Sequence, residues 1–96
     1  MSISTAYKPF LKSWKPEYGK KPTKTEINKA ETVARPGSKV AFALAMGMTP
    51  SGTTQSTIIK VLGLPHRNKI KQLTDEKKLK VRKSGKRPST LHLDVR

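Results

Sequence analysis

The chain has 96 residues, with 21 lysines and arginines against 6 acidic residues, and its net charge is +15. A chain of this length forms at most one domain with a small core. It contains no cysteine, which excludes disulfide scaffolds, cysteine-ligated zinc and thiol catalysis. The longest apolar run, residues 40–48, is too short to span a bilayer, and the first residues lack the pattern of a signal peptide. We therefore expect an intracellular protein of the cytoplasm or nucleoid.

The positive charge is concentrated in two segments. Residues 1–24 hold six lysines and one glutamate, and residues 60–87 hold eleven basic and two acidic residues, for net charges of +5 and +9. Residues 25–59 carry only +1. Self-repulsion favours an even spread of charge, so this concentration indicates that both basic segments face a polyanionic partner, of which nucleic acid is the usual one.

Residues 1–22 are predicted to form an extended basic arm, because three prolines interrupt them and no helical or strand period is present. Aromatic residues recur in the arm every three or four positions. Either they stack on nucleobases or they hold the arm against the surface of the domain. The arm residues with which we expect a nucleic acid to interact are Lys8, Lys12, Trp14, Lys15, Lys20 and Lys21.

Two helices are predicted in the nearly neutral middle of the chain. The first covers about residues 24–34, is capped by Thr23 or Thr25, and ends before Pro36 and Gly37. The second covers about residues 38–47. It is capped by Ser38, and Gly47 suits a left-handed turn at its end. This second helix is apolar nearly all round, which is typical of the buried helix in a small bundle.

Two further helices are predicted in the stretch "TTQSTIIKVLGLPHRNKIKQL". The first covers about residues 53–62, is capped by Thr53 or Thr54, and ends at Gly63, after which Leu64 is expected to return to the core. Its inward side chains are predicted to be Ile58, Ile59 and Leu62.

The other helix of this stretch covers about residues 65–76 and begins at Pro65, whose missing N–H is tolerated at a helix start. Only Ile70 and Leu73 anchor it. Its remaining positions are mostly polar or basic, so we expect them to face outward.

A period of two follows and predicts a β-hairpin with strands at residues 79–83 and 89–95. The segment between them, "KSGKRPS", forms a basic tip. The side chains predicted to face inward are Leu79, Val81, Leu91, Leu93 and Val95.

The order of these elements resembles a winged helix-turn-helix domain. The resemblance covers residues 40–95, through "VAFALAMG", "TTQSTIIKVLGL", "PHRNKIKQL" and "LKVRKSGKRPSTLHLDV". It implies a mostly helical α+β fold of three or four helices, with the hairpin as the wing. The segment between residues 63 and 79 is shorter than is usual in that family, and residues 1–38 have no counterpart in the minimal domain.

The resemblance also implies double-stranded DNA as the partner, with the second helix of the motif in the major groove. Arginine and lysine suit guanine, whereas asparagine and glutamine suit adenine. The candidates for base reading are His66, Arg67, Asn68, Lys69, Lys71 and Gln72. The candidates for phosphate contacts at the preceding helix are Thr53, Thr54, Gln55, Ser56 and Lys60. The wing candidates are Lys80, Arg82, Lys83, Lys86 and Arg87.

A small transcriptional regulator or an architectural or accessory DNA factor, of the kind found in phages, plasmids or archaea, is the expected function. We expect no enzymatic activity, cofactor, metal or small-molecule ligand, since no catalytic or metal-ligating constellation is evident. A homodimer through the neutral segment 25–48 is a further expectation. Two alternatives stay open: an RNA-binding or ribosome-associated protein, and an interaction module or inhibitor that docks on an acidic partner.

Overall fold

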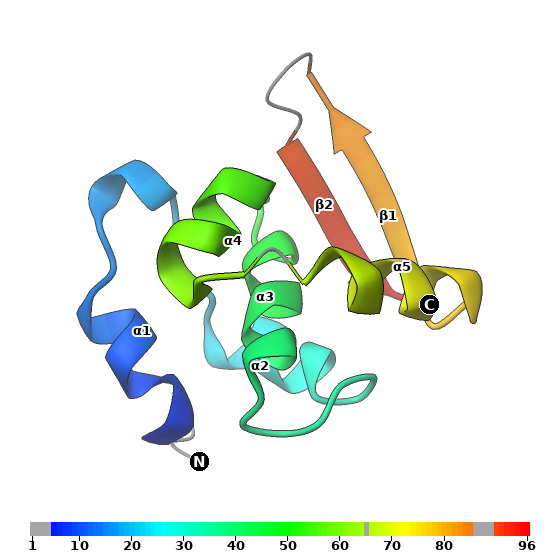
Figure 1. Ribbon diagram of the computed structural model, residues 1–96, viewed down its shortest axis with the longest axis horizontal. Helices are drawn as coiled ribbons and strands as arrows, with labels where there is room; N and C mark the ends of the chain where they lie inside the picture. Colours follow the sequence, from blue (N-terminus) through cyan, green and yellow to red (C-terminus); the bar gives the residue numbers. More distant parts are fainter. Residues whose placement is uncertain (1–4, 65, 86–89) are drawn as a thin grey trace.

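Helices and one β-hairpin together make an α+β fold in the computed structural model, which describes residues 5–64, 66–85 and 90–96 (Figure 1). In the described part of the chain there are five α-helices, one more than the four predicted. They are α1 (Lys8–Lys12), α2 (Lys24–Ala30), α3 (Lys39–Gly47), α4 (Gln55–Leu62) and α5 (Arg67–Asp75). Two short 3-10 helices, η1 (Thr5–Tyr7) and η2 (Pro16–Tyr18), and the strands β1 (Leu79–Ser84) and β2 (Thr90–Val95) complete the fold.

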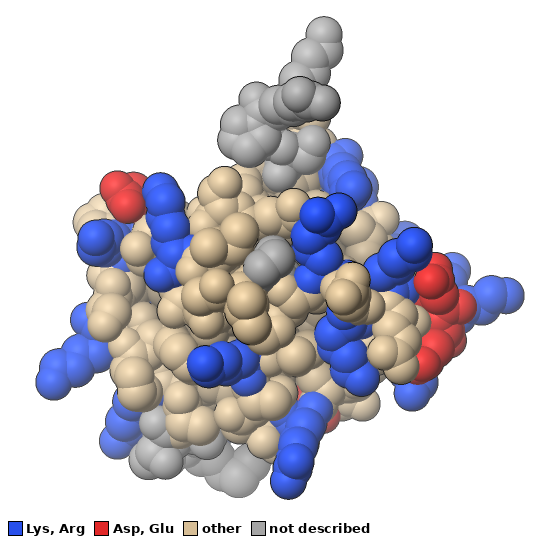
Figure 2. All heavy atoms as spheres, viewed as in Figure 1, with Lys and Arg blue, Asp and Glu red and all other residues tan. Residues whose placement is uncertain are grey.

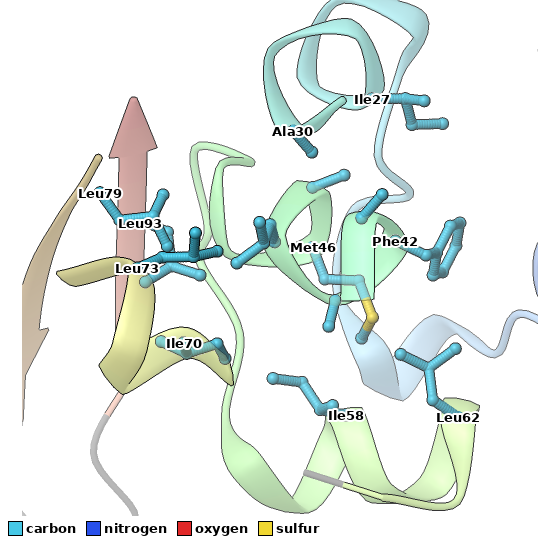
Figure 3. Close-up of a cluster of buried hydrophobic side chains, with 14 of the residues drawn as sticks. Ile27, Ala30, Phe42, Met46, Ile58, Leu62, Ile70, Leu73, Leu79 and Leu93 are labelled. Atoms are coloured by element: carbon cyan, nitrogen blue, oxygen red, sulfur yellow. The ribbon is translucent and has the colours of Figure 1, made fainter. Parts of the chain in front are cut away.

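Helix α3 lies at the centre of the core, as its apolar sequence predicted. All residues from 41 to 47 are buried, and the Ser38 side chain caps the helix by accepting a hydrogen bond from the Ala41 N–H. Figure 3 shows Met46 between α3 and the Ile58 and Leu62 side chains of α4. On another side of α3, Leu73 of α5 meets the Leu79 and Leu93 side chains of the hairpin (Figure 3). Because α3 is buried, the predicted dimer surface at residues 25–48 is reduced to α2 and its flanking turns.

Gly47 is the last residue of α3, but it does not form the predicted left-handed turn. Its φ is not positive, and the residue that follows it, Met48, has a right-handed helical conformation. A Cβ atom at Gly47 would lie 2.6 Å from Cγ and Cδ1 of Leu93. The absence of a side chain therefore lets strand β2 approach α3 closely.

The Gly47→Ala variant is expected to unfold more easily by about 1–3 kcal/mol, the usual range for overpacking a core. This loss would occur although alanine is the better helix former. Urea unfolding followed by circular dichroism measures it. In a Leu93→Ala background the same change should cost clearly less, and equal costs in both backgrounds would contradict the steric explanation.

The N-terminal segment is folded, so the prediction of an extended arm at residues 1–22 is wrong for its described part. Pro9 lies in the first turn of α1, where a missing N–H costs nothing, and Pro16 begins η2. Phe10 and Trp14 contact the buried ring of Phe42, with centroids 5.1 and 6.3 Å apart. Phe10 and Trp14 therefore hold the segment against the domain, as the second interpretation of the aromatic residues predicted.

Tyr7 connects this segment to the rest of the protein. Its side chain is fully buried, its hydroxyl donates to Oε2 of Glu31 at 2.8 Å, and it accepts from the N–H of Gly37 at 2.8 Å. Burial, together with the hydrogen bond to Glu31, raises the pKa of Tyr7 to about 12. One neutral phenol thus ties together η1, the end of α2 and the turn that precedes α3.

The stability contributed by Tyr7 is expected to be lost at alkaline pH. Its pKa in the folded state lies above the unfolded value of 10.0, so its contribution is complete below pH 10 and disappears as the pH rises towards about 12. The Tyr7→Phe variant should be less stable by about 1–2 kcal/mol at neutral pH, because Glu31 and Gly37 lose a partner. Its stability should then fall less than that of the wild type in this alkaline range. If the free energy of unfolding fell by the same amount in both proteins over this pH range, the prediction would be contradicted.

The boundaries of the other helices differ in part from the predicted ones. Helix α2 ends at Ala30 rather than near residue 34, because turns occupy residues 31–33. Thr54 caps α4 by accepting from the Thr57 N–H, and Gly63 ends the helix, both as predicted. Gly63 does so with a left-handed φ of 87°. Ile58 and Leu62 are buried, but Ile59 is 45% exposed.

The connection between α4 and α5 also differs from its prediction. Leu64 is 62% exposed and does not return to the core. His66, with a left-handed φ of 53°, precedes α5, which begins at Arg67 and not at Pro65. The role predicted for Pro65 lies outside the described residues.

The hairpin pairs Leu79 with Val95 and Ser84 with Thr90 at its two ends, and its strands lie close to the predicted bounds. Leu79, Leu91 and Leu93 are buried on its inner face, with Val81 and Val95 half-buried. One backbone pairing outside the two strands was not predicted. Thr53 forms an isolated antiparallel bridge with Leu91, through Thr53 N–H to Leu91 O at 3.0 Å and Leu91 N–H to Thr53 O at 2.6 Å. This bridge joins the residue before the cap of α4 to the hairpin.

Candidate nucleic-acid interface

A groove of about 780 Å³ lies between α5 and the inner face of the hairpin. Its apolar floor includes Ile70, Val81 and Leu91. Four basic side chains line it against the single acid Asp75: Arg67, Lys69, Lys71 and Lys83. Since α5 is anchored only by Ile70 and Leu73, as predicted, all its basic residues are left on the surface.

Five of the six base-reading candidates line this groove: His66, Arg67, Asn68, Lys69 and Lys71. The sixth, Gln72, does not. Its amide nitrogen donates to Oε2 of Glu76 at 3.0 Å, and Nζ of Lys78 lies 3.4 Å from Oε1 of the same carboxylate. The Gln72 hydrogen bond, followed by that from Lys78, holds the pKa of Glu76 below its usual range. The amide of Gln72 is therefore already engaged at the C-terminal end of α5.

The phosphate candidates at α4 are separated by the fold. Thr53 is only 5% exposed, which removes its side chain from any surface that a phosphate can reach and corrects its assignment. Thr54 is occupied as the cap of α4. Gln55 lines the groove beside α5, and Ser56 is exposed. Lys60 lies elsewhere, beside the N-terminal segment.

The wing candidates lie on two different faces of the hairpin. Lys83 pairs with Leu91 and shares the inner face with Val81, so it enters the groove. Lys80 and Arg82 pair with Asp94 and His92 on the outer face. The alternation of Leu79, Val81 and Lys83 along the strand is the sequence signal that could have separated the two faces. Lys86 and Arg87 lie outside the described residues.

His66 is the half-buried residue at the start of α5. Its Nε2 atom is buried and has no hydrogen-bond partner in the described structure. Burial, with a smaller effect from the charge of Lys39, lowers the pKa of His66. At neutral pH the ring therefore adds no charge to the groove.

Acidification is expected to destabilise the protein through His66. The pKa of this residue is lower in the folded state than the unfolded value of 6.5, so the unfolded chain takes up the proton first and stability falls as the pH drops below 6.5. Asparagine tolerates the left-handed conformation and does not titrate. From about pH 7.5 to about pH 5, the His66→Asn variant should therefore lose less stability than the wild type in urea unfolding. An identical loss in both proteins would show that His66 is not responsible.

A second groove, of about 370 Å³, lies between the N-terminal segment and α4. Phe10, Tyr18 and Val61 contribute to its walls, and Lys15 and Lys60 line it as well. Of the arm candidates, Lys8, Lys12, Lys20 and Lys21 are exposed and do not line this groove. Trp14 is half-buried, and its indole N–H donates to the Gly19 carbonyl at 2.9 Å. Sequence reasoning missed this groove, because it did not predict that the arm folds against α4.

On the face that carries α1, α4, α5 and the hairpin, the charged side chains are mostly basic, and the acidic groups lie mainly towards its edges (Figure 2). Figure 1 shows α1 and α5 on opposite sides of α4, so the two grooves lie in different parts of the molecule. Among the described residues, the only ion pair joins Lys78 and Glu76. The remaining described cations thus have no carboxylate partner.

Within the described ranges, no group of three or more acidic or histidine residues is placed to hold a metal ion. No described helix has the length and apolar character needed to cross a membrane. No protein-family model matches the chain, and neither the curated proteins nor the solved structures include a significant match.

Proposed function

We propose that the protein binds double-stranded DNA through α5 and the hairpin, in the manner of a winged helix-turn-helix domain. The supporting observation is the groove in which Arg67 and Lys71 of α5 and Lys83 of β1 come together. Three basic side chains from two elements thus line one groove. Their mutual repulsion destabilises the fold unless a polyanion binds there. A small transcriptional regulator or an architectural DNA factor is the role that such a domain would serve.

The order of elements supports this proposal. The chain passes from α3 through the Thr53 bridge to α4, α5 and the hairpin, and the bridge joins the start of α4 to β2. In a winged helix-turn-helix domain the second helix of the motif enters the major groove with its N-terminal residues near the base edges. Here those residues are Arg67, Asn68 and Lys71, which are exposed on α5. Gln72 is left out of the proposed contacts, since Glu76 holds its amide.

Duplex DNA is favoured over duplex RNA on geometric grounds. The major groove of B-form DNA admits an α-helix, whereas that of A-form RNA is deep and narrow and excludes side chains. Fluorescence anisotropy with a labelled DNA duplex, at several salt concentrations, measures the affinity and its salt dependence. We expect binding that weakens linearly with the logarithm of salt concentration.

Competition with unlabelled nucleic acids tests the choice of partner. At equal salt, unlabelled duplex DNA should displace the labelled duplex, while an RNA duplex of the same sequence should do so much less well. Equal or better competition by RNA would reject the proposal in favour of an RNA-binding protein. A selection from random duplex sequences would then report whether binding is specific and whether the site is palindromic, as a dimer requires.

A further inference from the structure

The second groove, between the N-terminal segment and α4, has the residues of a separate binding site. Phe10 and Tyr18 supply aromatic rings, and Val61 of α4 adds an apolar side chain. Its volume of about 370 Å³ falls within the usual range of small-ligand pockets, about 300–1,000 Å³. A duplex is far too wide for such a groove, but a single nucleotide fits it.

The two rings are held in place by the packing of the protein itself. Phe10 contacts the fully buried ring of Phe42 at a centroid distance of 5.1 Å. Tyr18 meets Trp14 edge-on, at 5.4 Å and 85°, and the Trp14 N–H donates to the Gly19 carbonyl. A ligand therefore meets rings that are already ordered, which lowers the entropic cost of binding.

The charge at this groove indicates an anionic ligand. Lys15 and Lys60 come from segments far apart in the sequence, yet the fold brings both to the same groove. No acid lines the groove, and within the described ranges neither lysine has an ion-pair partner. Lys8 and Lys12 of the exposed helix α1 add further positive charge to this side of the protein.

Aromatic rings beside cations are the combination that binds single-stranded nucleic acids, because bases stack on the rings while phosphates meet the lysines. Bases inside a duplex are stacked on each other and do not present their faces. We propose that this groove binds an unpaired nucleotide of a single strand, with its base against Tyr18 or Phe10 and its phosphates near Lys15 and Lys60. This site is independent of duplex binding at α5 and stands if that proposed function fails.

Binding of a short labelled oligothymidylate, measured by fluorescence anisotropy, tests the proposal. The Tyr18→Leu variant should bind it about 5- to 100-fold more weakly, while Tyr18→Phe, which keeps the ring, should stay within about twofold of the wild type. Combined Lys15→Gln and Lys60→Gln changes should weaken binding and reduce its salt dependence. Lys29→Gln, which alters one exposed lysine of α2 that lines neither groove, is the matched control and should have little effect.

Two further measurements localise the site. Circular dichroism establishes that each variant is folded, and duplex binding by Tyr18→Leu should be unchanged. In NMR spectra of the wild type, the oligonucleotide should shift the resonances of Phe10, Tyr18 and Val61.

Three outcomes would overturn the proposal. One is a loss of oligonucleotide affinity on Arg67→Ala but not on Tyr18→Leu, which would place the single strand at α5. The second is an equal loss for Tyr18→Phe and Tyr18→Leu, which would exclude stacking on the ring. The third is that a glutamate-rich peptide, and not the oligonucleotide, shifts the Phe10 and Tyr18 resonances, which would make the groove a site for an acidic protein.

Discussion

The Phe42→Ala variant is expected to lose about 3–5 kcal/mol of its free energy of unfolding, the usual cost of removing a buried phenylalanine ring. Phe42 is fully buried, and its ring contacts those of Tyr7, Phe10 and Trp14 at centroid distances of 5.5, 5.1 and 6.3 Å. Small proteins are stable by only about 5–15 kcal/mol, so this one change is expected to bring the chain close to unfolding.

Urea unfolding, followed both by circular dichroism and by the emission of the single tryptophan, Trp14, measures this loss. The tryptophan emission should shift to the red in Phe42→Ala already without denaturant, because the N-terminal segment loses the surface on which it packs. Ile59→Ala, at a side chain that is 45% exposed, is the control and should cost much less. A loss below about 1 kcal/mol for Phe42→Ala would contradict the central place of this ring.

The second large effect is expected on duplex binding. Combined Arg67→Ala, Lys71→Ala and Lys83→Ala changes should weaken the binding of all duplex sequences and lower the salt slope by about 1 for each phosphate that the variant no longer binds. Lys80→Ala is the matched control, since Lys80 lies on the same strand as Lys83 but on the outer face, opposite Asp94. If Lys80→Ala weakened binding as much as Lys83→Ala, the groove would not be the path of the DNA.

Base reading at α5 is separable from this general effect. If Arg67 or Asn68 makes a bidentate contact with a base, its replacement by alanine should reduce the discrimination between specific and random duplexes by about 1–3 kcal/mol. Lys83→Ala should weaken both duplexes alike. Equal losses on specific and random DNA for Arg67→Ala and Asn68→Ala would exclude base reading by this helix.

The helical part of the fold was largely predictable, because local signals determine it. These signals are the Ser38 and Thr54 caps, the helix end at Gly63 and the apolar positions of α3. Each one involves only residues that are close together in the sequence. The hairpin followed from its period of two. These features set the order of the elements and the outward position of the basic residues of α5.

The remainder depends on contacts between distant residues. The Thr53–Leu91 bridge joins residues 38 positions apart, and a single pair leaves no periodic pattern to detect. The N-terminal segment folds because the rings of Tyr7, Phe10 and Trp14 pack against the ring of Phe42. Helical periodicity in the sequence does not reveal such long-range contacts. The prolines of this segment indicated only a break in helical structure, although Pro9 lies at the start of a helix.

The sequence identifies candidate residues by the chemistry of their side chains, but it does not show where each side chain points in the fold. Gln72 was suited to base reading by its chemistry, yet Glu76 one turn later engages its amide. Lys60 was grouped with the phosphate contacts of its own helix, whereas the fold places it in the same groove as Lys15, away from α5. The Gln72–Glu76 pair follows from a spacing of four residues along one helix, which the sequence does contain. The position of Lys60 depends instead on the segment that packs beside α4.

The position of the Thr53–Leu91 bridge within the hairpin has a consequence for the response to mechanical force. Leu91 lies at the end of β2 that is farther from Val95, so a pull on the C-terminal end of the chain opens the β1–β2 hydrogen bonds one after another before it reaches the bridge. Leu93 leaves the core during that opening. We therefore expect the strand to unzip at low force rather than to shear as a unit.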